Sequence, residues 1–183
     1  ILFVFSPVLL VFSCLIFLED RGPIIYSQIR TGLNSKSFRM YKLRSMYINS
    51  EKNGATWAIS NDSRISKVGK IIRATRIDEL PQLISVLKGE MSLIGPRPER
   101  PEFDELLHKK IPFYYERYLV KPGLSGWAQV NYPYGASERD SSNKLSYDLF
   151  YIENFSFFID FIIFLKTIKL VINAKGSEQG SKV

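Results

Sequence analysis

The densest group of side chains able to do chemistry in this 183-residue chain is the acidic dyad, Asp78 and Glu79. Arg73 and Arg76 precede the dyad and Pro81 follows it. Adjacent residues on a helix diverge by about 100°, so the two carboxylates cannot act on one atom as a paired acid and base. They can divide the work, one as nucleophile or metal ligand and the other as metal ligand or orienting group. An ordinary surface network of arginine and acidic side chains is the alternative interpretation.

The sequence offers few residues for catalysis by cysteine or histidine. Cys14 is the only cysteine, so neither an intrachain disulfide nor a cysteine-based metal site can form. His108 is the only histidine and is expected on a helix surface, so zinc sites and histidine-based triads are excluded. Any metal used would be a hard, oxygen-ligated ion such as Mg²⁺.

The net charge of +7 is unevenly distributed. Residues 21–80 carry 12 lysines and arginines against 4 acids, whereas residues 81–183 are nearly balanced. A basic region of this kind suits the phosphates of a nucleotide, an anionic lipid surface or a nucleic acid. A solvated basic face without a ligand is the alternative.

The segments around the dyad predict a helix-dominated α+β domain. Residues 24–30 and 38–46 are β-prone and separated by a turn-forming stretch, which predicts a hairpin. Lys42 and Arg44 would share one face of its second strand, where two cations can grip a phosphate. A polar loop is expected over residues 50–63.

A long helical pattern then covers residues 64–93. Pro81 should bend or interrupt it just after Glu79, and Gly89 should cap its end. Beyond it, a proline-rich irregular loop holds Arg97 between two prolines. Two further helices are expected, one short and starting near residue 102, the other containing residues 144–154.

The first 18 residues carry no charge, which is borderline for a membrane crossing. Pro7, after Ser6, should bend a helix there. A re-entrant helix is favoured over a straight span and over a buried soluble helix. A signal peptide would need a basic start and a small-residue cleavage site, and neither is present. The chain begins without methionine, which suggests that upstream residues are missing.

A second apolar run covers residues 155–172 and contains Asp160, Lys166 and Lys169. Charges at mid-bilayer are costly, which argues against a span. A helix lying at the membrane interface and partly packed on the protein fits the pattern. Packing wholly inside a soluble domain is the alternative.

Four motifs occur in a fixed order after the apolar start: YKLRSM, RATRIDELPQLISVLKGEMSLIGPRPE, VKPGLSGWAQVN and YDLFYIEN. In this order they closely resemble the bacterial sugar transferase family, the monotopic phosphoglycosyl transferases that act on polyprenol phosphates. The resemblance covers residues 1–173. Several long motifs in order are far more specific than one short pattern.

The resemblance implies a two-step reaction with a UDP-sugar and Mg²⁺. An aspartate attacks the sugar-bearing phosphate, UMP leaves, and undecaprenyl phosphate then attacks the covalent sugar-phosphoryl intermediate. This reaction begins the assembly of exopolysaccharide, O-antigen or related glycans. The implied location is the cytoplasmic face of the bacterial inner membrane.

The resemblance also implies roles for single residues. Asp78 corresponds to the nucleophile and Glu79 to its partner acid, and together they would hold the metal. Ser6 and Pro7 correspond to the break in the re-entrant helix, and residues 65–76 and 155–172 to interfacial helices. The resemblance places Lys42, Arg73, Arg97 and Lys121 among the phosphate-binding cations and Asp148 in the active site. Arg44 is added to these cations because it would share a strand face with Lys42, and Gln82 is expected as a further active-site residue. Some members carry arginine at the position of Lys121, so a bidentate grip there is in doubt.

The predicted organisation is a re-entrant membrane helix over residues 1–20, a catalytic domain over 21–173 and a flexible tail over 174–183. A non-catalytic membrane adaptor that binds anionic lipid through the basic region is the alternative function. Nucleic acid is not expected as a partner, because no nucleic-acid motif accompanies the charge. The sequence leaves open the sugar and whether the chain forms a homo-oligomer.

Overall fold

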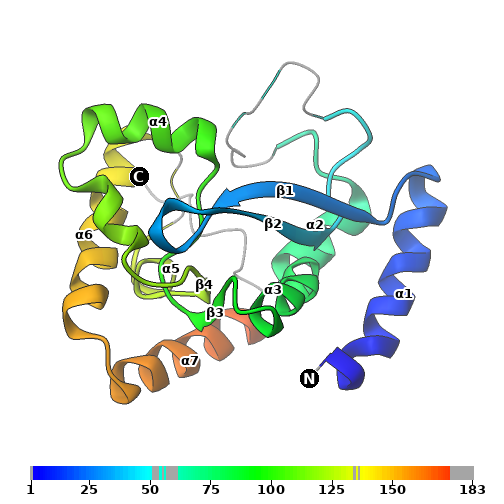
Figure 1. The fold of residues 1–183 in the computed structure, drawn as a ribbon. Helices are drawn as coiled ribbons and strands as arrows, with labels where there is room; N and C mark the ends of the chain where they lie inside the picture. Colours follow the sequence, from blue (N-terminus) through cyan, green and yellow to red (C-terminus); the bar gives the residue numbers. More distant parts are fainter. Residues whose placement is uncertain are drawn as a thin grey trace.

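The computed structural model describes residues 2–50, 54, 56, 62–133, 135 and 137–173, with side chains from residue 6 onward. Helices dominate the described residues and two small sheets complete them, so the helix-dominated α+β class is confirmed (Figure 1). Most of the predicted 50–63 loop and the predicted tail 174–183 lie outside the described residues. The helices are α1 (Leu2–Asp20), α2 (Lys67–Ala74), α3 (Leu83–Leu87), α4 (Pro101–Lys110), α5 (Trp127–Asn131), α6 (Glu138–Asn154) and α7 (Phe157–Ile172). The 3-10 turns are η1 (Leu33–Ser35), η2 (Ile77–Gln82) and η3 (Tyr114–Tyr118), and the strands are β1 (Ile25–Thr31), β2 (Ser37–Leu43), β3 (Ser92–Ile94) and β4 (Gly123–Ser125).

The predicted hairpin is confirmed. Strands β1 and β2 pair antiparallel, with Tyr26 opposite Lys42, and η1 forms the turn between them. Phe38 and Met40 on β2 are buried against Met91. The pleat turns alternate side chains to opposite faces, so Lys42 lies on the same side of β2 as these two core residues.

The prediction of one long helix over residues 64–93 is wrong, because the segment is divided into α2, η2 and α3. Helix α2 ends at Ala74, and Arg76 adopts a left-handed conformation with φ of 56°. The chain therefore breaks before the acidic dyad, which lies on η2, and Pro81 lies inside η2 without ending it. Tertiary packing outweighs helix propensity here, because Ile77 packs on the cluster around Ile72. The predicted stop is confirmed, since α3 ends at Leu87 and Gly89 follows with φ of 77°.

Helix α1 is anchored at its carboxyl end to α2 and to the hairpin. Glu19 accepts hydrogen bonds from the first backbone amides of α2, including that of Lys67 at 2.7 Å. Asp20 pairs with Arg44, and Ile16 is buried in the same cluster as Ile72. Helical structure runs on through Pro7. None of the helices in the described part of the chain is both long enough and apolar enough to cross a bilayer.

Helix α7 turns Asp160 and Thr167 toward the protein, while most of its large apolar residues are exposed. Asp160 accepts from the Tyr151 hydroxyl at 2.8 Å, and Thr167 pairs with Ser125 at 2.6 Å. Packing wholly inside the domain is therefore wrong for this helix, whereas partial packing is correct. The exposed large apolar residues of α7 are Phe157, Phe158, Phe161, Phe164, Leu165, Ile168 and Ile172.

A second core joins α4, η3 and α6 on the side of the molecule away from α1 (Figure 1). It confirms the two helices expected beyond the proline-rich loop. His108 is exposed on α4 and stacks on Tyr115, as a surface helix residue should. The buried members of this core are Phe103, Leu107, Ile111, Tyr114, Tyr118 and Leu145.

Candidate active site

Glu79 is the centre of a cluster of cations drawn from three parts of the chain. Its Oε1 accepts from Lys42 of β2 at 3.1 Å and from Arg97 at 2.6 Å. Its Oε2 contacts Arg76 at 3.4 Å. Burial raises the Glu79 pKa, but Arg97, Lys42 and Arg76 together hold it well below its usual value. Glu79 is therefore a fixed anion that collects the cations of the site.

Lys42 reaches this cluster because the face of β2 that packs on the core also faces η2. Burial lowers the Lys42 pKa from 10.5 to about 8, although Glu79 opposes the shift. The ammonium is therefore charged at neutral pH and loses its proton in mildly alkaline solution.

Asp78 has a different environment, although it is the neighbour of Glu79. Its side chain is only 7% exposed, and it makes no hydrogen bond or ion pair to the described residues. Burial and the charge of Glu79 raise the Asp78 pKa to about 6, while Lys42 and Arg73 act in the opposite direction. Asp78 is therefore ionised at neutral pH without a partner that occupies its oxygens, as a nucleophile requires.

Arg97 is positioned by two strands that approach each other very closely. Strands β3 and β4 pair in parallel, and the Gly123 amide donates to the Pro96 carbonyl at 2.8 Å. A Cβ added to Gly123 would lie 2.1 Å from the Gly95 nitrogen. Only glycine permits this approach, which fixes the 95–98 loop beside the dyad.

The structure brings some of the predicted cations together and separates others. Lys42 and Arg97 bind Glu79, and Arg73 lies close enough to lower the Asp78 pKa. Arg44 does not share their site, because it pairs with Asp20 and donates to the Ile16 carbonyl. The reason is that β2 ends at Leu43, so the alternation that would align Arg44 with Lys42 does not extend to it. Lys121 is exposed and its ammonium lies beside Gly89.

The other two predicted residues are buried. Gln82 is 2% exposed and lies three residues after Glu79, on the same side of a 3-10 turn. Its Nε2 has no hydrogen-bond partner among the described residues. Asp148 is also 2% exposed and pairs with Arg117 at 2.9 Å.

Three arginines outside the predicted set of phosphate-binding cations also contribute to the site. Arg76 contacts Glu79, Arg30 donates to Glu99 and to the Pro98 carbonyl, and Arg117 is buried between α6 and the 95–98 loop. A sequence signal existed for Arg117, because an arginine set among tyrosines is a candidate for a buried, stacked guanidinium.

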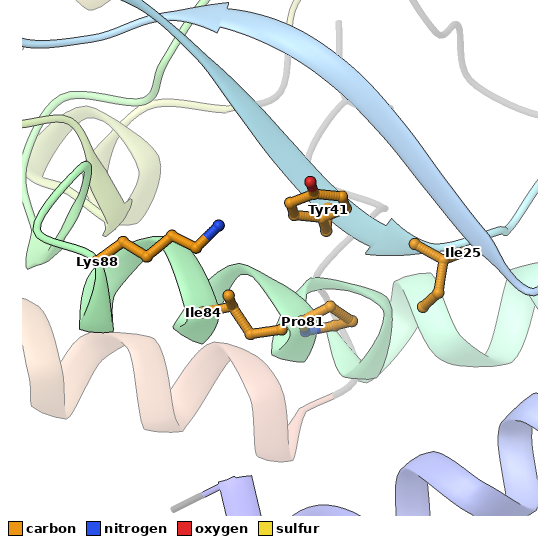
Figure 2. Close-up of a pocket in the computed structure, with 5 residues that line it drawn as sticks. All are labelled: Ile25, Tyr41, Pro81, Ile84 and Lys88. Atoms are coloured by element: carbon orange, nitrogen blue, oxygen red, sulfur yellow. The ribbon is translucent and has the colours of Figure 1, made fainter.

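An apolar groove of about 400 Å³ lies between the hairpin and the η2–α3 segment. Figure 2 shows Ile25 and Tyr41 on the hairpin side, with Pro81, Ile84 and Lys88 along the opposite wall. Pro81 follows Asp78 by three residues on η2, so the groove begins one turn from the nucleophile candidate, on the same side of the helix.

The donor set of the dyad suits a magnesium ion shared with phosphates. Among the described residues, no three acidic, histidine or cysteine side chains converge to hold a metal ion. Mg²⁺ needs no such cage, because one or two carboxylates plus substrate phosphates suffice. Within the part of the chain that the structure describes, the Asp78 oxygens accept no hydrogen bond and Glu79 Oε2 makes only the long contact with Arg76. Both residues can therefore contribute ligands.

Comparison of the sequence with known proteins places the chain in a family. Residues 1–174 match the family model described as "Bacterial sugar transferase". The chain belongs to the bacterial sugar transferase family. The resemblance read from the four motifs is thereby confirmed.

Relatives within the bacterial sugar transferase family share much of the sequence. A UDP-N-acetylgalactosamine-undecaprenyl-phosphate N-acetylgalactosaminephosphotransferase of Aeromonas hydrophila is 49% identical over 94% of this chain and 41% of its own length. A UDP-glucose:undecaprenyl-phosphate glucose-1-phosphate transferase of Klebsiella pneumoniae is 39% identical over 94% of this chain and 38% of its own length. A protein of the same name from Caulobacter vibrioides is 40% identical over 94% of this chain and 66% of its own length. The chain thus spans about two fifths of the first two relatives.

Proposed function

We propose that this chain transfers a sugar 1-phosphate from a UDP-sugar to undecaprenyl phosphate or a similar polyprenol phosphate, with release of UMP. The observation that carries the proposal is the Asp78 carboxylate, which has no partner among the described residues and lies beside a Glu79 that contacts three cations. The names of the relatives agree, since each describes transfer from a UDP-sugar to undecaprenyl phosphate. The reaction would initiate assembly of exopolysaccharide, O-antigen or a related glycan.

In the first step, an Asp78 oxygen attacks the phosphorus that carries the sugar. The bond from that phosphorus to the bridging oxygen breaks, and the electron pair leaves with UMP. Lys42, Arg73 and Arg97 are the cations that would face the phosphate oxygens, whose negative charge they offset.

Glu79 holds Lys42 and Arg97 in place before substrate arrives, so their positions need little reorganisation during the reaction. Mg²⁺ bound by Asp78 and Glu79 would neutralise charge on the diphosphate when present.

In the second step, a phosphate oxygen of the polyprenol acceptor attacks the same phosphorus and releases Asp78. Such an acceptor carries a long hydrocarbon chain and needs an apolar surface close to the nucleophile. The groove lined by Ile25, Tyr41, Pro81 and Ile84 supplies one beside η2. We assign the first isoprene units of the acceptor to this groove.

A polyprenol phosphate acceptor lies in a membrane, so an enzyme that uses it must attach to that membrane. The exposed apolar face of α7 would lie in the interface, because it would otherwise present a row of large side chains to water. We propose that α1 enters one leaflet and returns near Ser6 and Pro7, and that the catalytic residues face the cytoplasm at the bacterial inner membrane.

The test is a screen for UMP release by the full chain in membranes that contain undecaprenyl phosphate. UDP-N-acetylgalactosamine and UDP-glucose are the first donors to try, because relatives are named for both. UMP release that requires Asp78 is expected. Binding to anionic vesicles without UMP release from any donor would instead support a non-catalytic adaptor.

A further inference from the structure

Arg117 is a buried guanidinium at the junction of η3, α6 and the 95–98 loop. It is 8% exposed and lies over the rings of Tyr114 and Tyr118, with centroids 5.2 and 5.7 Å from its Cζ. Burial of this charge requires compensation by hydrogen bonds and an opposite charge.

Arg117 obtains that compensation from three separate parts of the chain. Its Nη1 donates to the Tyr114 hydroxyl at 2.7 Å. Its Nη2 donates to the Arg97 backbone carbonyl at 2.8 Å and lies 2.9 Å from Asp148 Oδ2. Arg117 therefore connects Asp148 of α6 to the backbone of the residue that binds Glu79.

The contact with the Arg97 carbonyl completes the restraint of the 95–98 loop. On the amino-terminal side, Gly95 donates to Ser125 at 2.9 Å and Pro96 accepts from Gly123. At Arg97 itself, Arg117 fixes the carbonyl. The ion pair with Glu79 selects one Arg97 rotamer, and a fixed backbone keeps that rotamer within reach of Glu79.

We propose that Arg117 is a positioning residue, which holds the Arg97 backbone so that the Arg97 guanidinium remains on Glu79 and faces the substrate phosphates. The kinetic consequences of this proposal depend on the transferase activity proposed above. Asp148, in turn, acts through Arg117, because it is buried against that guanidinium. This role differs from direct contact of Asp148 with substrate.

Lysine cannot replace Arg117 in this arrangement. The planar guanidinium presents donors in a fixed fork, whereas an ammonium is a single point of charge on a flexible stem. Arg117→Lys keeps the charge opposite Asp148 but loses the simultaneous grip on Tyr114 and the Arg97 carbonyl. A misplacement of about 1 Å at a catalytic group can lower the rate about 100-fold.

The kinetic test is a double-mutant cycle on UMP release by the full chain in bilayer discs. Arg117→Lys should lower kcat about 10- to 100-fold, and Arg97→Lys should lower it as well. If Arg117 acts through Arg97, the double variant should match Arg97→Lys alone. Losses that multiply instead would overturn the proposal, as would full activity in Arg117→Lys.

Arg64→Lys is the matched control, since Arg64 also pairs with a buried carboxylate, that of Asp62, outside the proposed site. It should leave kcat unchanged. A fall equal to that of Arg117→Lys would show that any loss of an arginine fork on a buried carboxylate impairs the enzyme, and would contradict a specific positioning role.

A second measurement does not depend on activity. Hydrogen exchange of the Gly95 amide should become about tenfold faster in Arg117→Lys, in proportion to the loss of one hydrogen bond to a charged group. Unchanged exchange would overturn the proposal. If the wild type releases no UMP from any donor, the proposed function fails, while faster exchange would still support the restraint of the loop.

Discussion

Arg97 donates to Glu79 Oε1 at 2.6 Å and so joins the proline-rich 95–98 loop to the acidic dyad. Lys42 donates to the same oxygen, so Glu79 holds both cations in place. The neighbouring Asp78 is left without such a partner among the described residues. The division of labour between two adjacent acids thus follows from which of them the surrounding cations can reach.

The pH dependence of kcat/KM should be bell-shaped. Asp78 must be ionised to attack, so activity should rise as the pH passes its pKa of about 6. Lys42 must be protonated to face phosphate, so activity should fall as the pH passes its pKa of about 8. UMP release measured from pH 5 to 9.5 checks this. Lys42→Arg should move the alkaline limb upward, and an unmoved limb would remove Lys42 from the assignment.

Asp78→Asn should abolish turnover and yet stabilise the fold. Because the folded-state pKa of Asp78 is raised from 3.8 to about 6, ionising Asp78 costs stability at neutral pH. The neutral amide avoids this cost, with an expected gain of about 1–3 kcal/mol at pH 8. The gain should shrink as the pH falls from 6 toward 4, where the native carboxyl is protonated. Denaturant unfolding at several pH values measures it.

The matched control for this effect is Glu79→Gln. It removes a charge that three cations share, so it should lower stability at pH 8. Stabilisation by both substitutions would mean that the two acids have equivalent surroundings, contrary to the geometry.

Arg44→Met should show that Arg44 supports the fold and does not bind the substrate. The substitution leaves Asp20 without its ion-pair partner at the end of α1, so stability should fall by about 1–3 kcal/mol. The KM for the UDP-sugar should not change. Lys42→Met, two residues earlier, should instead raise that KM about tenfold or more. An equal effect of both on KM would place Arg44 among the phosphate-binding cations after all.

Ile84→Ser should weaken binding of the lipid acceptor selectively. Ile84 lines the groove next to Pro81, and loss of its apolar contact should raise the KM for undecaprenyl phosphate about 5- to 30-fold. The KM for the UDP-sugar should remain as in the wild type. Leu106→Ser, at an exposed position on α4, is the control and should alter neither constant.

The sequence was most informative where structure is local. The hairpin turn, the stop at Gly89 and the helices α4 and α6 followed from residue patterns within a few positions. The adjacency of Asp78 and Glu79 was visible directly, and the family resemblance pointed to Lys42 and Arg97 as cations of the site, although not to their contact with Glu79.

Features that depend on distant contacts were not predictable in the same way. The break at Arg76 arises because Ile77 packs on the cluster around Ile72, which no local pattern reveals. Arg44 was misplaced because the end of β2 is set by pairing with β1. Arg117 escaped notice because its partners Arg97 and Asp148 lie 20 and 31 positions away in the sequence.

The most direct test of the central claim is to trap the covalent intermediate. The full chain is mixed with Mg²⁺ and a UDP-sugar labelled in the sugar-bearing phosphate, without polyprenol acceptor, and the modified peptide is located by mass spectrometry. The account predicts a sugar-phosphate on Asp78, stoichiometric UMP release, and neither in Asp78→Asn. Label on another residue, or turnover in Asp78→Asn at the wild-type rate, would contradict it.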